Sequence, residues 1–174
     1  PYTQVKFMPT GGVNAKNLND YLSFDKIIAC GGSWMVPPEL LSAGDYDGIR
    51  ELTRTAVKTM LGFELAHVGI NAGNEEEAAS IAKLFATVFG FEYKPGNSSI
   101  FTGSYVEVMK TPYLGEKGHI AISTNYIARA VAYLRSQGVA FNETSAKYDA
   151  KGNLIAIYLQ EEFGGFAVHL VQKK

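Results

Sequence analysis

Three histidines and one glutamate occupy matching places in the two halves of a weak internal repeat. Residues 66–70 (AHVGI) recur as residues 118–122 (GHIAI), and residues 105–108 (YVEV) recur as residues 167–170 (AVHL). Each segment alternates apolar and polar positions, which predicts a strand with one apolar face. The polar groups on the opposite faces are His67, Glu107, His119 and His169. Imidazole and carboxylate groups that converge on one face of a cupped sheet predict a binding site for a divalent metal.

The donor set also indicates which metals would bind. Imidazole nitrogen with carboxylate oxygen suits Zn²⁺, Ni²⁺, Fe²⁺ or Mn²⁺ better than Ca²⁺. A histidine on a strand is also commonly a half-buried, hydrogen-bonded residue, so a metal-free cluster kept for packing stays open. The chain has no other histidine, which favours the metal. Tyr105 and Met109 share the face of Glu107, and Ser123 shares that of His119, so these three are candidates for lining the cavity.

The composition predicts a globular protein and argues against some classes of binding partner. The chain has 174 residues, 47% of them hydrophobic and 19% charged, values typical of a globular protein with a sizeable core. A net charge of −1 argues against nucleic acid or an anionic membrane as partner. Apolar stretches are too short to cross a bilayer. A single cysteine, Cys30, and the lack of a signal-peptide pattern predict a cytoplasmic protein.

Residues 63–174 repeat one order of elements, a strand, a helix and then several strands. The apolar spacing predicts helices over residues 75–89 and 126–137. Turn signals occur at residues 95–97, 149–153 and 163–165. Together with the four polar-faced strands, this order predicts an α+β fold made of two βαβββ modules.

Residues 1–61 follow a different order, in which short apolar strands alternate with helices. Strands are expected at residues 5–8 and 26–30, as a parallel pair in which each strand is followed by glycines. Asn14 is the expected cap of a helix over residues 15–22, and Asp45 that of a longer helix ending at Gly62. The order predicts two β/α units, and the boundary between the two domains lies near Gly62.

The first segment resembles 2-keto-3-deoxy-6-phosphogluconate aldolase. The resemblance rests on residues 5–13 (VKFMPTGGV), 29–37 (ACGGSWMVP) and 43–47 (AGDYD). It covers residues 1–61 and implies the last two β/α units of a (β/α)₈ barrel. Since the chain begins at Pro1 with a strand-like segment, we expect a fragment of a longer protein. The resemblance implies that the parent is a class I aldolase, a lyase without a cofactor, which cleaves its substrate to pyruvate and glyceraldehyde 3-phosphate.

By the same resemblance, the two glycine loops would bind the substrate phosphate. The backbone N–H groups after the last strands of such barrels commonly hold a phosphate. The residues concerned are Thr10, Gly11, Gly12, Gly32 and Ser33. The alternative is that these glycines only make tight turns between strand and helix.

The lysine that forms the Schiff base of the family has no counterpart here. It belongs to an earlier strand of the barrel, as does the acid–base glutamate, so Lys6 is not expected to be the nucleophile. We therefore expect no aldolase activity from this chain alone. Two β/α units leave apolar strand edges exposed, so the missing part of the barrel or a second copy in a homo-oligomer is expected to cover them.

Residues 63–174 resemble the vicinal oxygen chelate superfamily, which includes glyoxalase I and extradiol dioxygenases. The resemblance implies paired βαβββ modules forming a cupped sheet around one divalent metal. His67, Glu107 and His119 match ligand positions of the superfamily. The fourth position usually carries a glutamate that also moves protons, and here it is His169, so standard glyoxalase proton transfer is not expected.

These observations predict a fusion of part of an aldolase, residues 1–61, with a complete vicinal oxygen chelate domain, residues 63–174. The second domain would be a metal-dependent lyase or oxygenase that acts on a small molecule. The alternative is a non-catalytic module for dimerisation or ligand sensing, without metal.

Overall fold

The computed structural model describes residues 4–173, which form two units. The first unit ends at Gly62 and the second begins at Phe63. No helix in the described range is both long and apolar enough to cross a bilayer.

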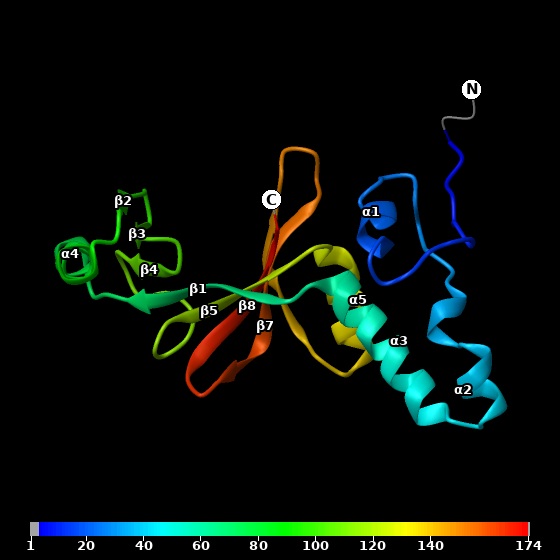
Figure 1. Ribbon diagram of the computed structural model, residues 1–174. Helices are drawn as coiled ribbons and strands as arrows, with labels where there is room; N and C mark the ends of the chain where they lie inside the picture. The colour runs from blue at the N-terminus through cyan, green and yellow to red at the C-terminus, as the bar shows by residue number, and fades with distance from the viewer. Residues whose placement is uncertain (1–3, 174) are drawn as a thin grey trace. The chain divides into compact units, whose positions relative to one another are not determined.

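The first unit consists mainly of short helices and one longer helix (Figure 1). Its elements are α1 (Leu18–Leu22), the 3₁₀ turn η1 (Ser33–Met35), α2 (Pro38–Ser42) and α3 (Tyr46–Leu61). The Asp45 side chain accepts a hydrogen bond from the N–H of Gly48 at the start of α3, and Gly62 ends the helix in the left-handed conformation. Both ends of α3 therefore lie where the capping residues predict.

The two strands expected in this unit are reduced to one parallel bridge, between Phe7 and Ile27. The N–H of Phe7 donates to the carbonyl of Lys26 at 2.8 Å, and the N–H of Ile28 donates to the carbonyl of Phe7 at 3.1 Å. Phe7 is 52% exposed and Ile28 is 57% exposed. A pair of strands without further neighbours buries too little apolar surface to extend the ladder.

The first helix begins later than expected. Residues 14–17 form a turn, in which the N–H of Lys16 donates to the Asn14 side chain, and α1 starts at Leu18. Asparagine favours such local hydrogen bonds, which compete with the first turn of a helix.

The second unit is one eight-stranded sheet with two helices. Its elements are β1 (Glu64–Asn71), α4 (Glu75–Phe89), β2 (Tyr93–Pro95), β3 (Ser99–Thr102), β4 (Val106–Met109), β5 (His119–Thr124), α5 (Ile127–Ser136), β6 (Phe141–Tyr148), β7 (Leu154–Phe163) and β8 (Phe166–Gln172). The strand order is β2-β3-β4-β1-β5-β8-β7-β6. This order confirms the predicted α+β fold of two βαβββ modules, which an approximate twofold axis through the β1–β5 pair relates to each other.

The register explains the internal repeat. β1 and β5 are antiparallel, with Val68 opposite Ile120, Gly69 opposite His119 and His67 opposite Ala121. Exchanging the two modules maps the Val68–Ile120 pair onto itself and the Gly69–His119 pair onto the His67–Ala121 pair. β1 also pairs in parallel with β4, as β5 does with β8. The four central strands are therefore the four that carry the polar groups singled out from the sequence.

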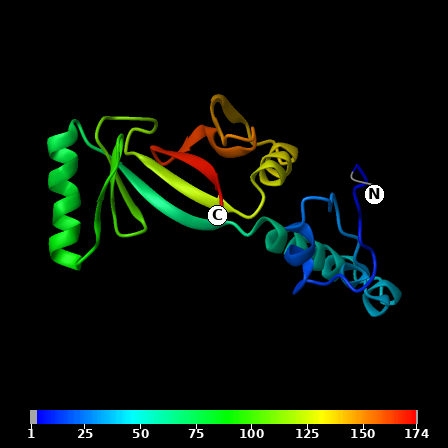
Figure 2. The same cartoon turned by 90° about the horizontal axis from the view of Figure 1, so that it is seen from above.

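The two faces of the sheet have different surroundings. Helix α4 packs on β3 and β4, and α5 packs on β7 and β8 (Figure 2). Beneath α4 the buried Ile100 and Val108 form a core with Ala78 and Ala82 of the helix. These strand residues alternate with the polar positions, so the polar groups lie on the opposite face.

Candidate metal centre

The four polar groups are brought together by cross-strand pairing. Glu107 on β4 lies opposite Gly69 on β1, which in turn lies opposite His119 on β5. The equivalent row of the other module runs in the opposite direction across the sheet: His67 on β1 lies opposite Ala121 on β5, which lies opposite His169 on β8. Each row places one small residue between two large ones, so the side chains lean over the small residue toward each other. We call His67, Glu107, His119 and His169 the His/Glu cluster.

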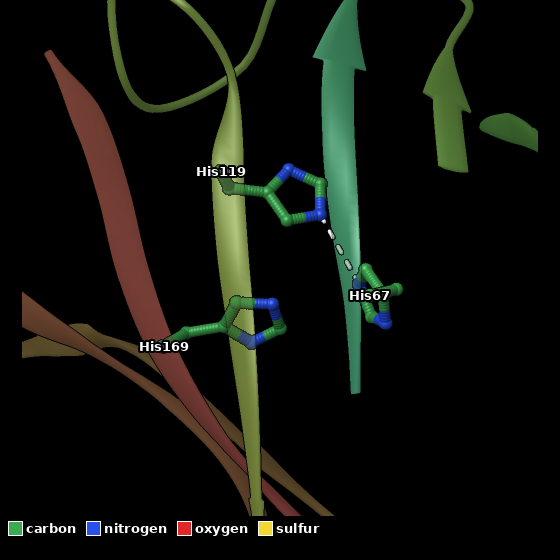
Figure 3. Close-up of side chains that lie close together, drawn as sticks. All are labelled: His67, His119 and His169. Carbon is green, nitrogen blue, oxygen red and sulfur yellow. Dashed lines mark hydrogen bonds between the residues drawn. The ribbon is translucent and has the colours of Figure 1, made fainter. Parts of the chain in front are cut away.

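Three atoms of the cluster form a nearly equilateral triangle. Nε2 of His67 lies 3.0 Å from Oε2 of Glu107, and Nε2 of His119 lies 3.1 Å from the same oxygen. The two Nε2 atoms are 3.2 Å apart. His169 is part of the same group, because ligand atoms of the three histidines all lie within 4.8 Å of one another. Figure 3 shows the three rings converging from β1, β5 and β8.

These separations fit one metal ion. Ligand atoms about 2.1 Å from one ion are about 3.0 Å apart at a right angle and about 3.4 Å apart at the tetrahedral angle. Two imidazoles and one carboxylate on one face of an ion are also the donor set of many iron and zinc centres. The triangle therefore has the dimensions and the chemistry that a divalent transition metal requires.

His169 supplies an independent test of the fit. It is only 7% exposed, and neither of its ring nitrogens has a hydrogen-bond partner in the described chain. A buried polar atom without a partner costs free energy, so such an atom calls for a partner outside the protein. The ring is held by Tyr158, which stacks on it with 4.5 Å between centroids and 16° between planes. His169 is thus a buried, stacked imidazole whose two ring nitrogens have no partner among the described residues.

The protonation states favour metal binding. Burial raises the pKa of Glu107, but hydrogen bonds from His119, His67 and Ser99 outweigh it and hold that pKa well below its usual range. Burial, reinforced by the neighbouring histidines, lowers the pKa of His169 to about 3. Near neutral pH, Glu107 is therefore a carboxylate and His169 a neutral imidazole, the forms that bind metals.

Gly69 provides the space that His119 occupies. A Cβ built at this glycine would lie closer than 3.0 Å to Cε1, Nδ1 and Nε2 of the imidazole. Real Cβ atoms essentially never approach so closely. Its backbone does not have a positive φ, so the glycine is required by the close approach of His119 and not by its own conformation.

The cluster lies in a cleft of about 420 Å³, a size suited to a small molecule. Met109 lines it, as expected from the sequence, whereas Tyr105 and Ser123 are not among its lining residues. Tyr105 is 63% exposed in a turn, and the Ser123 hydroxyl donates to the carbonyl of Glu64.

Residues that the sequence pattern did not single out also contribute to the cleft. They are Phe101, Lys147 and Tyr158 in the wall, and Ser99, whose hydroxyl donates to Glu107 at 2.6 Å.

The two glycine loops of the first unit lie side by side. The N–H of Gly31 donates to the carbonyl of Pro9 at 2.9 Å, which joins the loop before Gly32 and Ser33 to the loop of Thr10, Gly11 and Gly12. In the described chain the N–H groups of Gly11, Gly12, Gly32 and Ser33 donate to no partner. Space beside Gly11 and Gly12 is open, whereas the Trp34 ring covers Gly32. The residues named from the resemblance are therefore adjacent and have free donors.

The first segment is similar in sequence to known aldolases. Residues 1–52 match the family model of KDPG and KHG aldolase. The KHG/KDPG aldolase of Escherichia coli (strain K12) is 50% identical over 58 residues, which are 33% of this chain and 27% of that protein. The 2-dehydro-3-deoxy-phosphogluconate aldolase of Treponema pallidum (strain Nichols) is 43% identical over 58 residues, 33% of this chain and 28% of that protein. The chain thus spans about a quarter of the length of these relatives.

Solved structures similar to this chain share little sequence with it. A hypothetical protein from Bacillus halodurans C-125 has a TM-score of 0.46 and 15% identity, over 64% of this chain and 95% of that one. A methylmalonyl-CoA epimerase variant of Streptomyces coelicolor, in complex with 2-nitronate-propionyl-CoA, has a TM-score of 0.45 and 16% identity, over 63% and 96% of the two chains. The fold of the second unit is assigned from its own strand order and register. The chain thus joins a segment that matches the KDPG and KHG aldolase family to a unit of paired βαβββ modules, the vicinal oxygen chelate fold.

Proposed function

We propose that the second unit is a metal-dependent enzyme domain that binds one Zn²⁺, Ni²⁺, Fe²⁺ or Mn²⁺ through the His/Glu cluster and acts on a small molecule in the adjoining cleft. The observation that carries this proposal is the triangle of ligand atoms with sides of 3.0 to 3.2 Å. The free ring nitrogens of the buried His169 support it. When bound, the metal would supply a Lewis acid that polarises an oxygen of the substrate.

The protein groups around the cluster have separate tasks. Ser99 donates to Oε1 of Glu107, which leaves Oε2 toward the histidines. Tyr158 holds the ring of His169 by stacking, while Phe101 meets the ring of His67 edge-on, 5.3 Å between centroids. These neighbours orient the ligands before a metal arrives, which lowers the cost of ordering them on binding.

An open cleft favours an enzyme over a purely structural module. A domain kept only for dimerisation needs no cavity beside its polar groups. The cleft here has about 420 Å³ next to four potential ligands, and both Tyr158 and Lys147 line it. Glu107 is the sole carboxylate of the cluster, because His169 stands where the superfamily usually has a second one that moves protons. The proposed activity is therefore not proton transfer of the glyoxalase type.

For the first unit we propose the C-terminal part of a class I aldolase barrel whose two glycine loops bind a phosphate. The free N–H groups of Gly11, Gly12, Gly32 and Ser33, with Thr10 beside them, support this role. The exposed Phe7 and Ile28 are apolar surface that the rest of the barrel, or a second copy of this chain, would cover. Cleavage of a 2-keto-3-deoxy sugar acid phosphate would belong to the complete protein.

Elemental analysis and chelator competition test the metal proposal. The purified chain, saturated with Zn²⁺ and desalted, should retain about one equivalent. Glu107→Gln keeps the shape of the side chain but removes its charge, so the affinity for zinc should fall at least about tenfold. Glu162→Gln makes the same change on an exposed part of β7 outside the cleft and should leave the affinity unchanged. Absence of bound metal in the wild-type protein would overturn the proposal.

A further inference from the structure

Among the described residues, one lysine lines the cleft without an ion-pair partner. Lys147 lies on β6, the edge strand next to β7, and its side chain lines the cleft. It pairs across the sheet with Ala156, which pairs in turn with Val171, two residues beyond His169. Lys147 therefore projects from the same face of the sheet as the His/Glu cluster. Within residues 4–173 it forms no ion pair or hydrogen bond through its side chain.

The charges of the cleft follow from its lining residues. Of the described residues that line it, Glu107 is the only acid and Lys147 the only lysine or arginine. Without a metal these two charges cancel. A divalent cation in the His/Glu cluster would bring the net charge of the cleft to about +2, because the three histidines bind as neutral imidazoles. A cleft with walls of low polarity and a positive charge selects an anion.

The cleft also offers a tyrosine hydroxyl group. Tyr158 on β7 lines the cleft beside His169 on β8, and its hydroxyl has no hydrogen-bond partner in the described chain. Phe101, Met109 and Tyr113 make much of the remaining wall apolar. A ligand that matches this lining has an oxygen-rich end, an anionic group and a short carbon skeleton.

We propose that the cleft binds a small organic acid, with its anionic group held by Lys147 and its other oxygens directed toward the His/Glu cluster. This proposal rests on the proposed metal site, because the metal supplies most of the positive charge. A carboxylate and a phosphate would both satisfy Lys147, whose ammonium group binds either as a point charge. Lys147 is thus the residue that binds the anionic group of the ligand directly.

Titration calorimetry on the zinc-loaded chain tests the proposal with defined probes. The probes are 2-oxoglutarate, 3-phosphoglycerate and the uncharged dimethyl ester of 2-oxoglutarate. The wild-type protein should bind at least one of the acids more tightly than the ester, and the tighter acid identifies the preferred anionic group. Lys147→Gln should weaken binding of that acid about tenfold while leaving the ester unchanged. Lys147→Arg should retain most of the affinity because it keeps the charge.

Lys151→Gln is the matched control. It removes the same charge from the turn after β6, outside the cleft, so the acid should bind as it does to the wild-type protein. Zinc content, measured on every sample, decides the metal proposal separately. Equal affinity of Lys147→Gln and Lys151→Gln for the acid, or no preference of the wild type for either acid over the ester, would overturn the role of Lys147 at any zinc content.

Discussion

Replacing Gly69 with alanine should disable the proposed metal centre although none of its ligands is replaced. The new Cβ would stand closer than 3.0 Å to three atoms of the His119 ring, whereas an ordinary contact begins at 3.4 Å. The ring would have to move by about 1 Å, which is several times the tolerance of about 0.2 Å for a metal–ligand distance. His119 is 2% exposed and has little free space, so the strain should also destabilise the metal-free protein by about 1–3 kcal/mol.

The assay is competition for Zn²⁺ against a chromophoric chelator, with thermal unfolding measured in parallel. We expect Gly69→Ala to bind zinc at least about 100-fold more weakly than the wild type. Gly73→Ala is the matched control on the segment that follows β1. Its Cβ would meet only the end of the flexible Glu77 side chain, at 3.1 Å, so affinity and stability should stay close to those of the wild type.

A double-mutant cycle locates the effect in the ring of His119. In a His119→Ala background the clash is absent, so adding Gly69→Ala should cost almost no further stability. If folded Gly69→Ala binds zinc within threefold of the wild type, the close approach of Gly69 and His119 does not position the ligand, and the reasoning fails.

Three further outcomes follow from the same contacts. His169→Phe keeps a ring to stack on Tyr158 but removes two buried nitrogens that have no partner. Urea titration of the metal-free variant should therefore give a free energy of unfolding about 1 kcal/mol higher than that of the wild type. Chelator competition should show that the variant binds zinc at least tenfold more weakly. The free energy of unfolding of the metal-free wild type should fall by about 1–2 kcal/mol between pH 7 and pH 5. Burial lowers the pKa of His169 to about 3, so below about pH 6.5 this histidine takes up a proton in the unfolded chain but not in the folded one. Urea titrations at both pH values should find a smaller loss in His169→Phe, and an equal loss would contradict this cause. Borohydride reduction in the presence of pyruvate should leave every lysine of the chain unmodified, Lys6 included, and a covalent adduct found by mass spectrometry would show that a Schiff-base lysine is present after all.

Local sequence was sufficient for most of the elements and for the composition of the candidate site. Helix α4 runs over residues 75–89 as its apolar spacing predicts. The internal repeat identified the four members of the His/Glu cluster, because a strand of period two can carry a polar group opposite an apolar face only at fixed positions. The two glycine loops could also be recognised from the sequence, because each is a short motif of residues that are adjacent in the chain.

Other features depended on contacts between distant segments. The bridge between Phe7 and Ile27 is all that remains of the expected strand pair, because strand length depends on neighbours that the local pattern does not specify. The same holds for Lys147 and Tyr158, which reach the cleft only through the pairing of β6 and β7 with β8.

The sequence by itself determined which residues could bind a metal and on which strands they lie. Only the tertiary structure decided that His67, Glu107 and His119 come within 3.0 to 3.2 Å of one another, and that Gly69 leaves room for one of the rings. The physical reason is that a strand pattern specifies the face of each side chain, whereas the distance between side chains on different strands is set by strand order and register.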